Sequence, residues 1–147
     1  LMTEILIKRL SKNIILPKYE TSGSSGLDLS ANIKTSVKIK PGKTTIIPTG
    51  ISVSIPKNFE IQIRPRSGLA AKNQISVLNT PGTIDADYRG EIKVILINLS
   101  KETFIVENGA RIAQMVVCPV IKAKLKEVDS LDNTSRGSDG FGSTGMK

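Results

Sequence analysis

Apolar and polar residues alternate with a period of two along much of this chain. Aliphatic or aromatic residues occupy every second position in segments 5–8, 37–40, 51–55 and 59–64. Because alternate side chains of a strand lie on one face, this pattern predicts strands with one buried face. Two continuous apolar runs, at 94–97 and 115–117, are typical of strands covered on both faces.

Seven prolines lie between these segments or at their ends, and only residues 67–72 have a helical composition. The pattern therefore predicts an all-β barrel or sandwich of short antiparallel strands with one short helix. A chain of 147 residues is long enough for one hydrophobic core, and it shows no internal repeat. We expect a core domain over 1–121, a polar linker over 122–135 and a mobile glycine-rich tail over 136–147.

The composition excludes several kinds of catalysis. The chain contains no histidine and a single cysteine, Cys118. Ser-His and Cys-His mechanisms and imidazole metal sites are thus excluded, and a general base must be Asp, Glu, Lys, Tyr or that cysteine. A cation held by oxygen ligands stays possible. With one cysteine, no signal-peptide pattern and no apolar run of membrane-spanning length, the sequence favours a cytoplasmic protein without a membrane partner.

The net charge of +8 favours an anionic partner such as a nucleotide, a nucleic acid or an acidic surface. With three phenylalanines, two tyrosines and no tryptophan, the chain has few aromatic rings on which single-stranded bases could stack. The basic residues are also dispersed along the chain. A nucleic-acid partner is therefore not expected despite the positive charge.

The most informative stretch runs from Gly82 to Glu91, between the apolar segments 75–78 and 92–99. It places Asp85, Asp87 and Tyr88 near the tip of an expected β-hairpin. Such a tip can present carboxylates, an aromatic ring and backbone groups to a small ligand. An ordinary solvated hairpin would have the same charge spacing.

Three further segments carry polar residues beside turns. Asp28 follows a glycine turn, Arg66 and Ser67 lie where a strand meets the expected helix, and Gln114 lies on a strand beginning near 109. Arg66 can bind a phosphate with two hydrogen bonds. On local chemistry alone, Asp28 could instead close an Asx turn and Ser67 could cap the helix.

The tail combines four of the twelve glycines with Arg136 and Phe141. Glycines expose backbone N–H groups and the neighbouring hydroxyls add donors, so the closed tail could cradle phosphates while Phe141 covers a flat ring. A plain disordered terminus is the alternative.

Taken in order, these segments resemble the five motifs of the trimeric dUTP nucleotidohydrolases (dUTPases). The matching segments are 25–29, 65–70, 79–91, 109–114 and 136–145. The strings Gly-Thr-Ile-Asp-Ala-Asp-Tyr-Arg-Gly at 82–90 and Gly-Phe-Gly-Ser-Thr-Gly at 140–145 are the most specific. The resemblance implies a jelly-roll-like subunit, a homotrimer with active sites shared between subunits, and Mg²⁺-assisted hydrolysis of dUTP to dUMP and pyrophosphate. Such an enzyme removes dUTP from the DNA precursor pool and supplies dUMP for dTMP synthesis.

The resemblance also implies a role for each site residue. Asp85 would be the base that activates water for attack on the α-phosphorus, Tyr88 would exclude a ribose 2′-hydroxyl, and Asp28 would hold waters of the metal. The residues implied to bind uracil or touch the substrate nearby are Asn79, Gly82, Thr83, Ile84 and Lys93. The residues implied to hold phosphates are Arg66, Ser67, Gly68 and Gln114 in the core, with Arg136, Gly142, Ser143 and Thr144 in the tail, where Phe141 would stack on uracil.

Two positions depart from the family pattern. Ser25 stands where alanine is common, and Asp139 stands where the tail usually has glycine. A carboxylate at 139 should repel a triphosphate, which bears on the pose of the tail. Three alternative functions stay open: a dCTP deaminase of the same fold, a non-catalytic nucleotide sensor, and a nucleic-acid-binding module. Turnover of dUTP against dCTP and salt-dependent nucleic-acid binding distinguish them.

Overall fold

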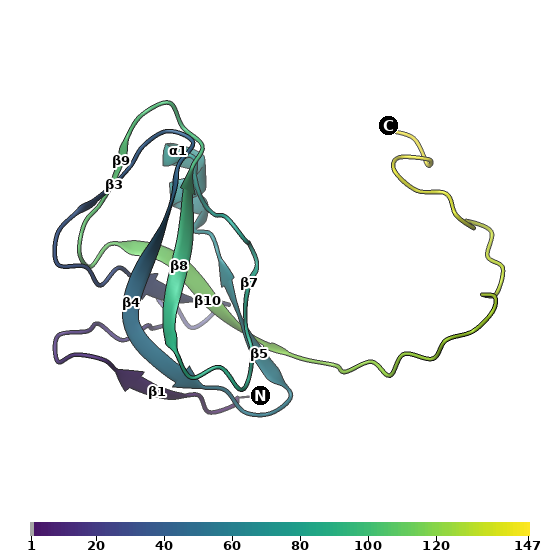
Figure 1. Ribbon diagram of the computed structural model, residues 1–147, viewed down its shortest axis with the longest axis horizontal. Helices are drawn as coiled ribbons and strands as arrows, with labels where there is room; N and C mark the ends of the chain where they lie inside the picture. The colour runs from purple at the N-terminus through teal and green to yellow at the C-terminus, as the bar shows by residue number, and fades with distance from the viewer. Residues whose placement is uncertain (1) are drawn as a thin grey trace.

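The computed structural model describes residues 2–147, so residue 1, the start of the expected core domain, lies outside it. Ten strands and one helix make up the body of the molecule (Figure 1). In chain order they are β1 (Leu6–Arg9), β2 (Leu27–Ser30), β3 (Val37–Ile39), β4 (Thr44–Ser54), β5 (Phe59–Arg64), α1 (Ser67–Asn73), β6 (Ile75–Val77), β7 (Gly82–Ile84), β8 (Glu91–Asn98), β9 (Phe104–Val106) and β10 (Arg111–Pro119).

Two four-stranded sheets and one two-stranded ribbon account for these strands. The first sheet has the order β1-β4-β8-β6, the second has the order β2-β10-β5-β7, and β3 pairs with β9. Every pairing is antiparallel. Because non-consecutive strands are neighbours in both sheets, the chain passes repeatedly between them. The all-β fold with one short helix, predicted from the sequence, is confirmed.

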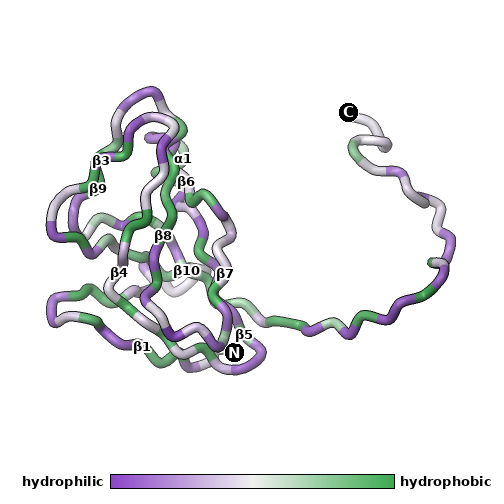
Figure 2. Tube along the Cα trace, viewed as in Figure 1, coloured by the Kyte–Doolittle hydropathy of each residue, from purple (hydrophilic) through white to green (hydrophobic). Residues whose placement is uncertain are grey.

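A single aliphatic core lies between the two sheets. Ile47, Ile92 and Leu96 enter it from the first sheet, and Leu29 and Ile61 enter it from the second, all essentially inaccessible to solvent. Buried and less buried residues alternate along β5 and β8, which supply Ile61, Ile92 and Leu96, as the period-two pattern requires. Figure 2 shows the matching green stretches along the strands of the body.

One buried amide joins the first sheet to the ribbon. The side chain of Asn98, at the end of β8, donates to the carbonyl oxygens of Ile39 (2.8 Å) and Glu102 (2.7 Å). Its Oδ1 accepts from the backbone N–H of Ser100 (2.9 Å) and from its hydroxyl (2.7 Å). All four hydrogen-bonding positions of the amide are used. Asn98 therefore fixes the end of β8 against β3 and the turn that leads to β9.

The expected hairpin at 82–91 is wrong in one respect. The flanking strands β6 and β8 do pair, with Ile75 opposite Asn98 and Val77 opposite Leu96. The residues between them do not form a simple tip, because Gly82–Ile84 crosses to the second sheet and pairs with β5. The sequence shows two apolar strands around a polar segment but does not show that this segment carries a strand of its own.

Two other expectations need correction. β1 was expected to have one buried face, but all four of its residues are exposed. The apolar runs at 94–97 and 115–117 were expected to be covered on both faces, but Ile95, Ile97 and Val117 are only half-buried. Apolar alternation alone does not distinguish a face buried within one subunit from a face left for another partner.

After β10 the chain leaves the body as an extended arm (Figure 1). Within residues 2–147, the bond from Val120 N–H to the carbonyl of Asn58 (2.8 Å) is the last backbone bond to the body. Apolar side chains of the arm face solvent, with Ile121 94% and Leu125 92% exposed. Green stretches among purple mark this part of the arm in Figure 2.

The Asn98 network gives a stability prediction. Asn98→Leu keeps a similar volume but leaves the buried groups around it without partners, at about 1–3 kcal/mol for each that stays buried. We expect the free energy of unfolding to fall by roughly 3 kcal/mol or more, against about 1 kcal/mol for Ser100→Ala, which removes only the hydroxyl. Urea denaturation at one protein concentration measures both. Equal midpoints for Asn98→Leu and the parent would contradict this role.

Candidate functional site

The pairing of β10 with β2 and β5 gathers charged and polar side chains from three segments. Gln114 lies opposite Asp28 on one side and opposite Arg64 on the other. Two residues beyond Arg64, Arg66 precedes α1, and its Nε lies 3.7 Å from Asp28 Oδ1. Arg66 Nη1 also donates to the carbonyl of Arg111 at 3.2 Å. The strand register thus explains why residues 28, 66 and 114 meet.

These side chains surround an open depression. It is lined by Glu20, Ser24, Ser25, Gly26, Asp28, Arg66, Ser67, Gly68, Arg111 and Gln114. Guanidinium groups, hydroxyls and an amide predominate in this lining. Such donors suit an anion with many acceptor oxygens, for example a chain of phosphates.

Gln114 is held by its neighbours in one orientation. Its Nε2 donates to the carbonyl of Pro65 at 3.2 Å. On its other side lies Gly26, where an added Cβ would be only 3.1 Å from Gln114 Cδ and closer still to Oε1. Gly26 therefore lets the amide pack directly against the backbone of the turn before β2.

Arg111 was missing from the residues expected from the sequence. Its Nη1 donates to Asp28 Oδ2 at 3.1 Å and lies 3.7 Å from Glu20 Oε1. Asp28, whose side chain is 18% exposed, therefore faces two guanidinium groups. The signal in the sequence was an arginine at the start of an otherwise apolar strand. Its direction depends on the register shift between residues 111 and 113, which no periodicity shows.

The segment expected to bind uracil continues along the second sheet. Asn79 lies close to Gly82, where a Cβ would be 3.2 Å from Asn79 Nδ2. Thr83 pairs with Gln62 and Ile84 pairs with Ile61. Thr80 and Pro81 line a shallow pocket together with Ser67 and Gln114. The beginning of this segment is therefore adjacent to the cluster around Asp28.

Asp85 and Tyr88 lie where the chain turns from β7 towards β8. Both are exposed, and Tyr88 N–H donates to the carbonyl of Asp85 at 3.1 Å. Tyr88 Oη donates to the carbonyl of Glu91 at 2.8 Å. Glu91 Oε2 in turn accepts from the N–H of Gly50 at 2.9 Å, which ties this turn to β4. Lys93 follows as an exposed residue of β8.

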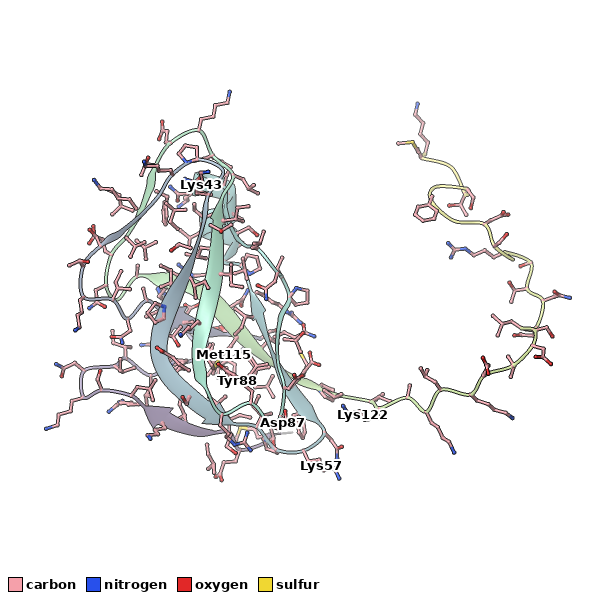
Figure 3. The ribbon with its side chains drawn as sticks, in the orientation of Figure 1. Lys43, Lys57, Asp87, Tyr88, Met115 and Lys122 are labelled. Atoms are coloured by element: carbon pink, nitrogen blue, oxygen red, sulfur yellow. The ribbon has the colours of Figure 1, made fainter. Side chains whose placement is uncertain are left out.

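Within one subunit, Asp85 is remote from the cluster around Asp28. β7 runs antiparallel to β5, so Ile84 lies beside Ile61 and Asp85 continues towards Glu60. Arg66 lies six residues away in the opposite direction, a separation of about 20 Å for extended chain at about 3.3 Å per residue. Figure 3 shows Asp87 towards the end of the molecule that carries Lys57, whereas α1 lies towards the end that carries Lys43 (Figures 1 and 3).

The tail residues are not brought to either group. Arg136 Nε donates to the carbonyl of Asp139 at 2.8 Å, and Ser143 N–H donates to the carbonyl of Gly140 at 3.0 Å. The tail thus forms small turns of its own at the end of the arm (Figure 1). Phe141, Gly142, Ser143 and Thr144 are all exposed.

Comparison of this sequence and fold with known proteins identifies the family. The family model described as dUTPase matches residues 12–145. The chain belongs to the dUTPase family. The deoxyuridine 5′-triphosphate nucleotidohydrolase of Gloeothece citriformis is 57% identical over 143 residues, 97% of each chain. That of Rickettsia bellii is 55% identical over 146 residues, 99% of this chain and 97% of the relative.

A solved structure supports the same family. The Staphylococcus bacteriophage 80alpha dUTPase with dUPNHPP aligns with a TM-score of 0.85 and 27% sequence identity, covering 99% of this chain and 100% of that one. The resemblance inferred from the five motifs is thereby confirmed. No helix within residues 2–147 is long and apolar enough to cross a bilayer.

The side chains that could bind a metal ion indicate how this dUTPase could use one. Across residues 2–147 there is no group of three or more Asp, Glu, His or Cys side chains placed to hold an ion. The carboxylate best placed near the polar depression, Asp28, already faces Arg66 and Arg111. One carboxylate shared with two arginines does not fit direct coordination of a resident cation. It fits contact with the water shell of a cation that arrives with its ligand.

The Arg111–Asp28 contact gives a second prediction. In a double-mutant cycle of Arg111→Ala with Asp28→Asn, we expect a coupling energy of about 0.5–1 kcal/mol in unfolding at low salt, since the pair is partly exposed. The longer and more exposed contact with Glu20 serves as the matched control, and a cycle with Glu20→Gln should give a smaller value. Zero coupling with Asp28 would show that Arg111 does not hold this carboxylate.

Proposed function

We propose that this protein hydrolyses dUTP to dUMP and pyrophosphate. The observation that carries the proposal is the family membership, with relatives 55–57% identical over nearly their full length that are named deoxyuridine 5′-triphosphate nucleotidohydrolases. By this activity the enzyme removes dUTP from the DNA precursor pool and supplies dUMP for dTMP synthesis.

In this proposal the depression around Asp28 receives the triphosphate. Arg66, Ser67, Gly68 and Gln114 supply hydrogen-bond donors to phosphate oxygens. A Mg²⁺ ion bound with the triphosphate would supply positive charge that offsets the negative charge developing during the reaction. Asp28 would contact the waters of that ion, which agrees with the pairing of its carboxylate with arginines and with the lack of a multidentate metal cluster within 2–147.

The turn from β7 to β8 binds the nucleoside. Asn79 and the backbone of Gly82, Thr83 and Ile84 pair with the uracil edge, and a cytosine there would leave mismatched groups at roughly 1–3 kcal/mol each. Tyr88 packs against the deoxyribose, where a 2′-hydroxyl would collide with the ring. Lys93 touches the substrate through its backbone.

Asp85 acts as the general base. It removes a proton from water while the water oxygen bonds to the α-phosphorus and the bond from that phosphorus to the α–β bridging oxygen breaks, releasing pyrophosphate. The chain has no histidine, so a carboxylate is the chemically suited group. In the subunit this side chain is exposed, which leaves it open to a bound nucleotide.

The separation within the subunit supports a shared site. A nucleotide with its base on Gly82–Ile84 and its α-phosphate at Asp85 extends away from Arg66 and Gln114 of the same chain. The phosphate-binding residues must then come from another subunit, as in a homotrimer with active sites between chains. Apolar side chains left exposed on and beside the first sheet also suit burial against a second copy. Examples are Ile46 on β4, Leu78 directly after β6 and Leu99 directly after β8.

The arm completes the site in the same proposal. Residues 122–135 carry the tail, 136–147, to another subunit, where Phe141 covers uracil while Arg136, Gly142, Ser143 and Thr144 contact the phosphates. The extended course of the arm and its exposed apolar residues support this reach. Asp139 adds a negative charge near the phosphates and weakens closure relative to a glycine there.

Asp85→Asn tests the role of the base. An amide cannot accept the proton of water, so we expect kcat for dUTP to fall by about 10²–10⁴ while the affinity for dUPNHPP is kept. Asp87→Asn, two residues away and equally exposed, is the matched control and should keep most turnover. Pyrophosphate release measures kcat, and calorimetry measures affinity. Parent-like turnover of Asp85→Asn would exclude it as the base.

Mixing two inactive variants tests the shared site. Asp85→Asn is combined with a chain that ends after Ser135, and the two are unfolded together and refolded. If Asp85 and the tail of one site come from different subunits, every mixed trimer has one site with both intact, or about one site in three. Activity should reappear on mixing and stay absent from either variant refolded alone.

The mixing experiment can also contradict the shared site. Mixed trimers whose composition is verified by mass spectrometry, and which remain inactive, would show that the tail serves Asp85 of its own chain.

A further inference from the structure

The ring of Tyr88 packs directly over Gly90. A Cβ built on Gly90 would be 2.6 Å from Tyr88 Cζ, 2.9 Å from Cε1, and closer still to Oη. These separations are shorter than any van der Waals contact between carbon atoms. An aromatic ring and a side chain at position 90 therefore cannot both occupy this space.

One hydrogen bond holds the hydroxyl end of the ring, and Arg89 holds the backbone from which the side chain starts. The Tyr88 hydroxyl donates to the carbonyl of Glu91 at 2.8 Å, so the side chain spans residue 90. At its base, Arg89 Nη1 donates to the carbonyl of Tyr88 at 3.1 Å and to that of Ala86. The outward side of the ring stays open, and Tyr88 is 42% exposed. The ring is therefore backed by Gly90 and presents its other face outward.

Backbone conformation does not require glycine here. Gly90 is absent from the glycines with positive φ, such as Gly50 and Gly109. The demand for glycine at 90 is therefore one of space. The neighbouring backbone cannot retreat easily, because Glu91 pairs with Ser52 and its carboxylate accepts from Gly50. The terminal, partly exposed ring is the part that must move if a Cβ is added.

We infer that Gly90 determines sugar specificity by providing the surface on which the Tyr88 ring is seated. The inference rests on the proposed function, in which Tyr88 lies against the deoxyribose and excludes a 2′-hydroxyl. The Tyr88 ring can distinguish deoxyribose from ribose, which differ by one oxygen atom, only if its position is fixed to a fraction of an ångström. Gly90 fixes the depth of the ring, and the bond to Glu91 fixes its end.

Gly90→Ala should displace the ring without removing it. A shift of about 1 Å in a positioning group can cost about 10²-fold in rate, so we expect kcat/KM for dUTP to fall by up to that factor. The ratio of kcat/KM for dUTP over UTP should fall in the direction shown by Tyr88→Ala. Gly23→Ala is the matched control, because a Cβ at Gly23 meets nothing within 4 Å, and its ratio should equal that of the parent.

The composition offers a readout independent of turnover. The chain has two tyrosines and no tryptophan, so Tyr19→Phe leaves Tyr88 as the one source of tyrosine emission. In that background, Gly90→Ala should increase quenching of the tyrosine emission by acrylamide, because a displaced ring exposes both faces. Gly23→Ala should leave the quenching constant unchanged.

A double variant separates this inference from the proposed function. In the Tyr88→Ala background, Gly90→Ala should have no further effect on the dUTP/UTP ratio, since no ring remains to be displaced. If Tyr88→Ala itself leaves the ratio unchanged, the proposed sugar-binding role of Tyr88 fails. If Tyr88→Ala lowers the ratio while folded Gly90→Ala keeps both the ratio and the quenching of the parent, the role of Gly90 is overturned and that of Tyr88 stands.

Folding gives the remaining outcomes. If Gly90→Ala fails to fold but the double variant with Tyr88→Ala folds, removal of the ring has relieved the clash, as the inference requires. If neither folds, or if Gly90→Ala lowers the ratio equally with and without the ring, the added Cβ acts through the backbone and the inference is wrong.

Discussion

The second sheet, with its order β2-β10-β5-β7, is the constraint on which the candidate site depends. Its edge strand β2 and the two central strands β10 and β5 place Asp28, Gln114 and Arg64 side by side, so the polar depression follows directly from strand register. Its other edge strand, β7, runs antiparallel to β5 and carries the chain away from that depression. One sheet therefore carries both groups of candidate site residues and at the same time keeps Asp85 about 20 Å from Arg66. The shared site proposed above is a consequence of this geometry.

Glycine contributes to the site mainly through close approach. Gly26 lies against Gln114, Gly82 against Asn79, and Gly90 against Tyr88. In each pair the missing Cβ leaves space that a polar or aromatic side chain fills. Because such side chains are backed by rigid backbone, their outward atoms are positioned without a large buried network around them. Positioning by close contact with backbone suits a small protein whose candidate site lies at its surface.

Period-two alternation was sufficient to predict the all-β class and several of the strands, because burial on one face is a local property of a strand. The short helix was predicted from the composition of residues 67–72. The alternation could not predict that β7 crosses to the other sheet, since residues 82–84 are too few to show a period. It also mistook β1 for a half-buried strand, because the alternation does not show that all four of its residues lie exposed on the surface of the chain. Arg111 was missed since its contact with Asp28 joins residues 83 positions apart. The five motifs were sufficient to predict the family. The distance between Asp85 and the cluster around Asp28 within one chain is visible only in the fold.

We propose that one active site takes Asp85 and its phosphate-binding residues from different chains. The most direct measurement is a crystal structure of the assembled protein with dUPNHPP and Mg²⁺, with each contact assigned to its chain. We expect the carboxylate of Asp85 to lie one water away from the α-phosphorus, while Arg66 and Gln114 of another chain contact the phosphates. A structure in which all three residues belong to one chain around the same nucleotide would contradict it.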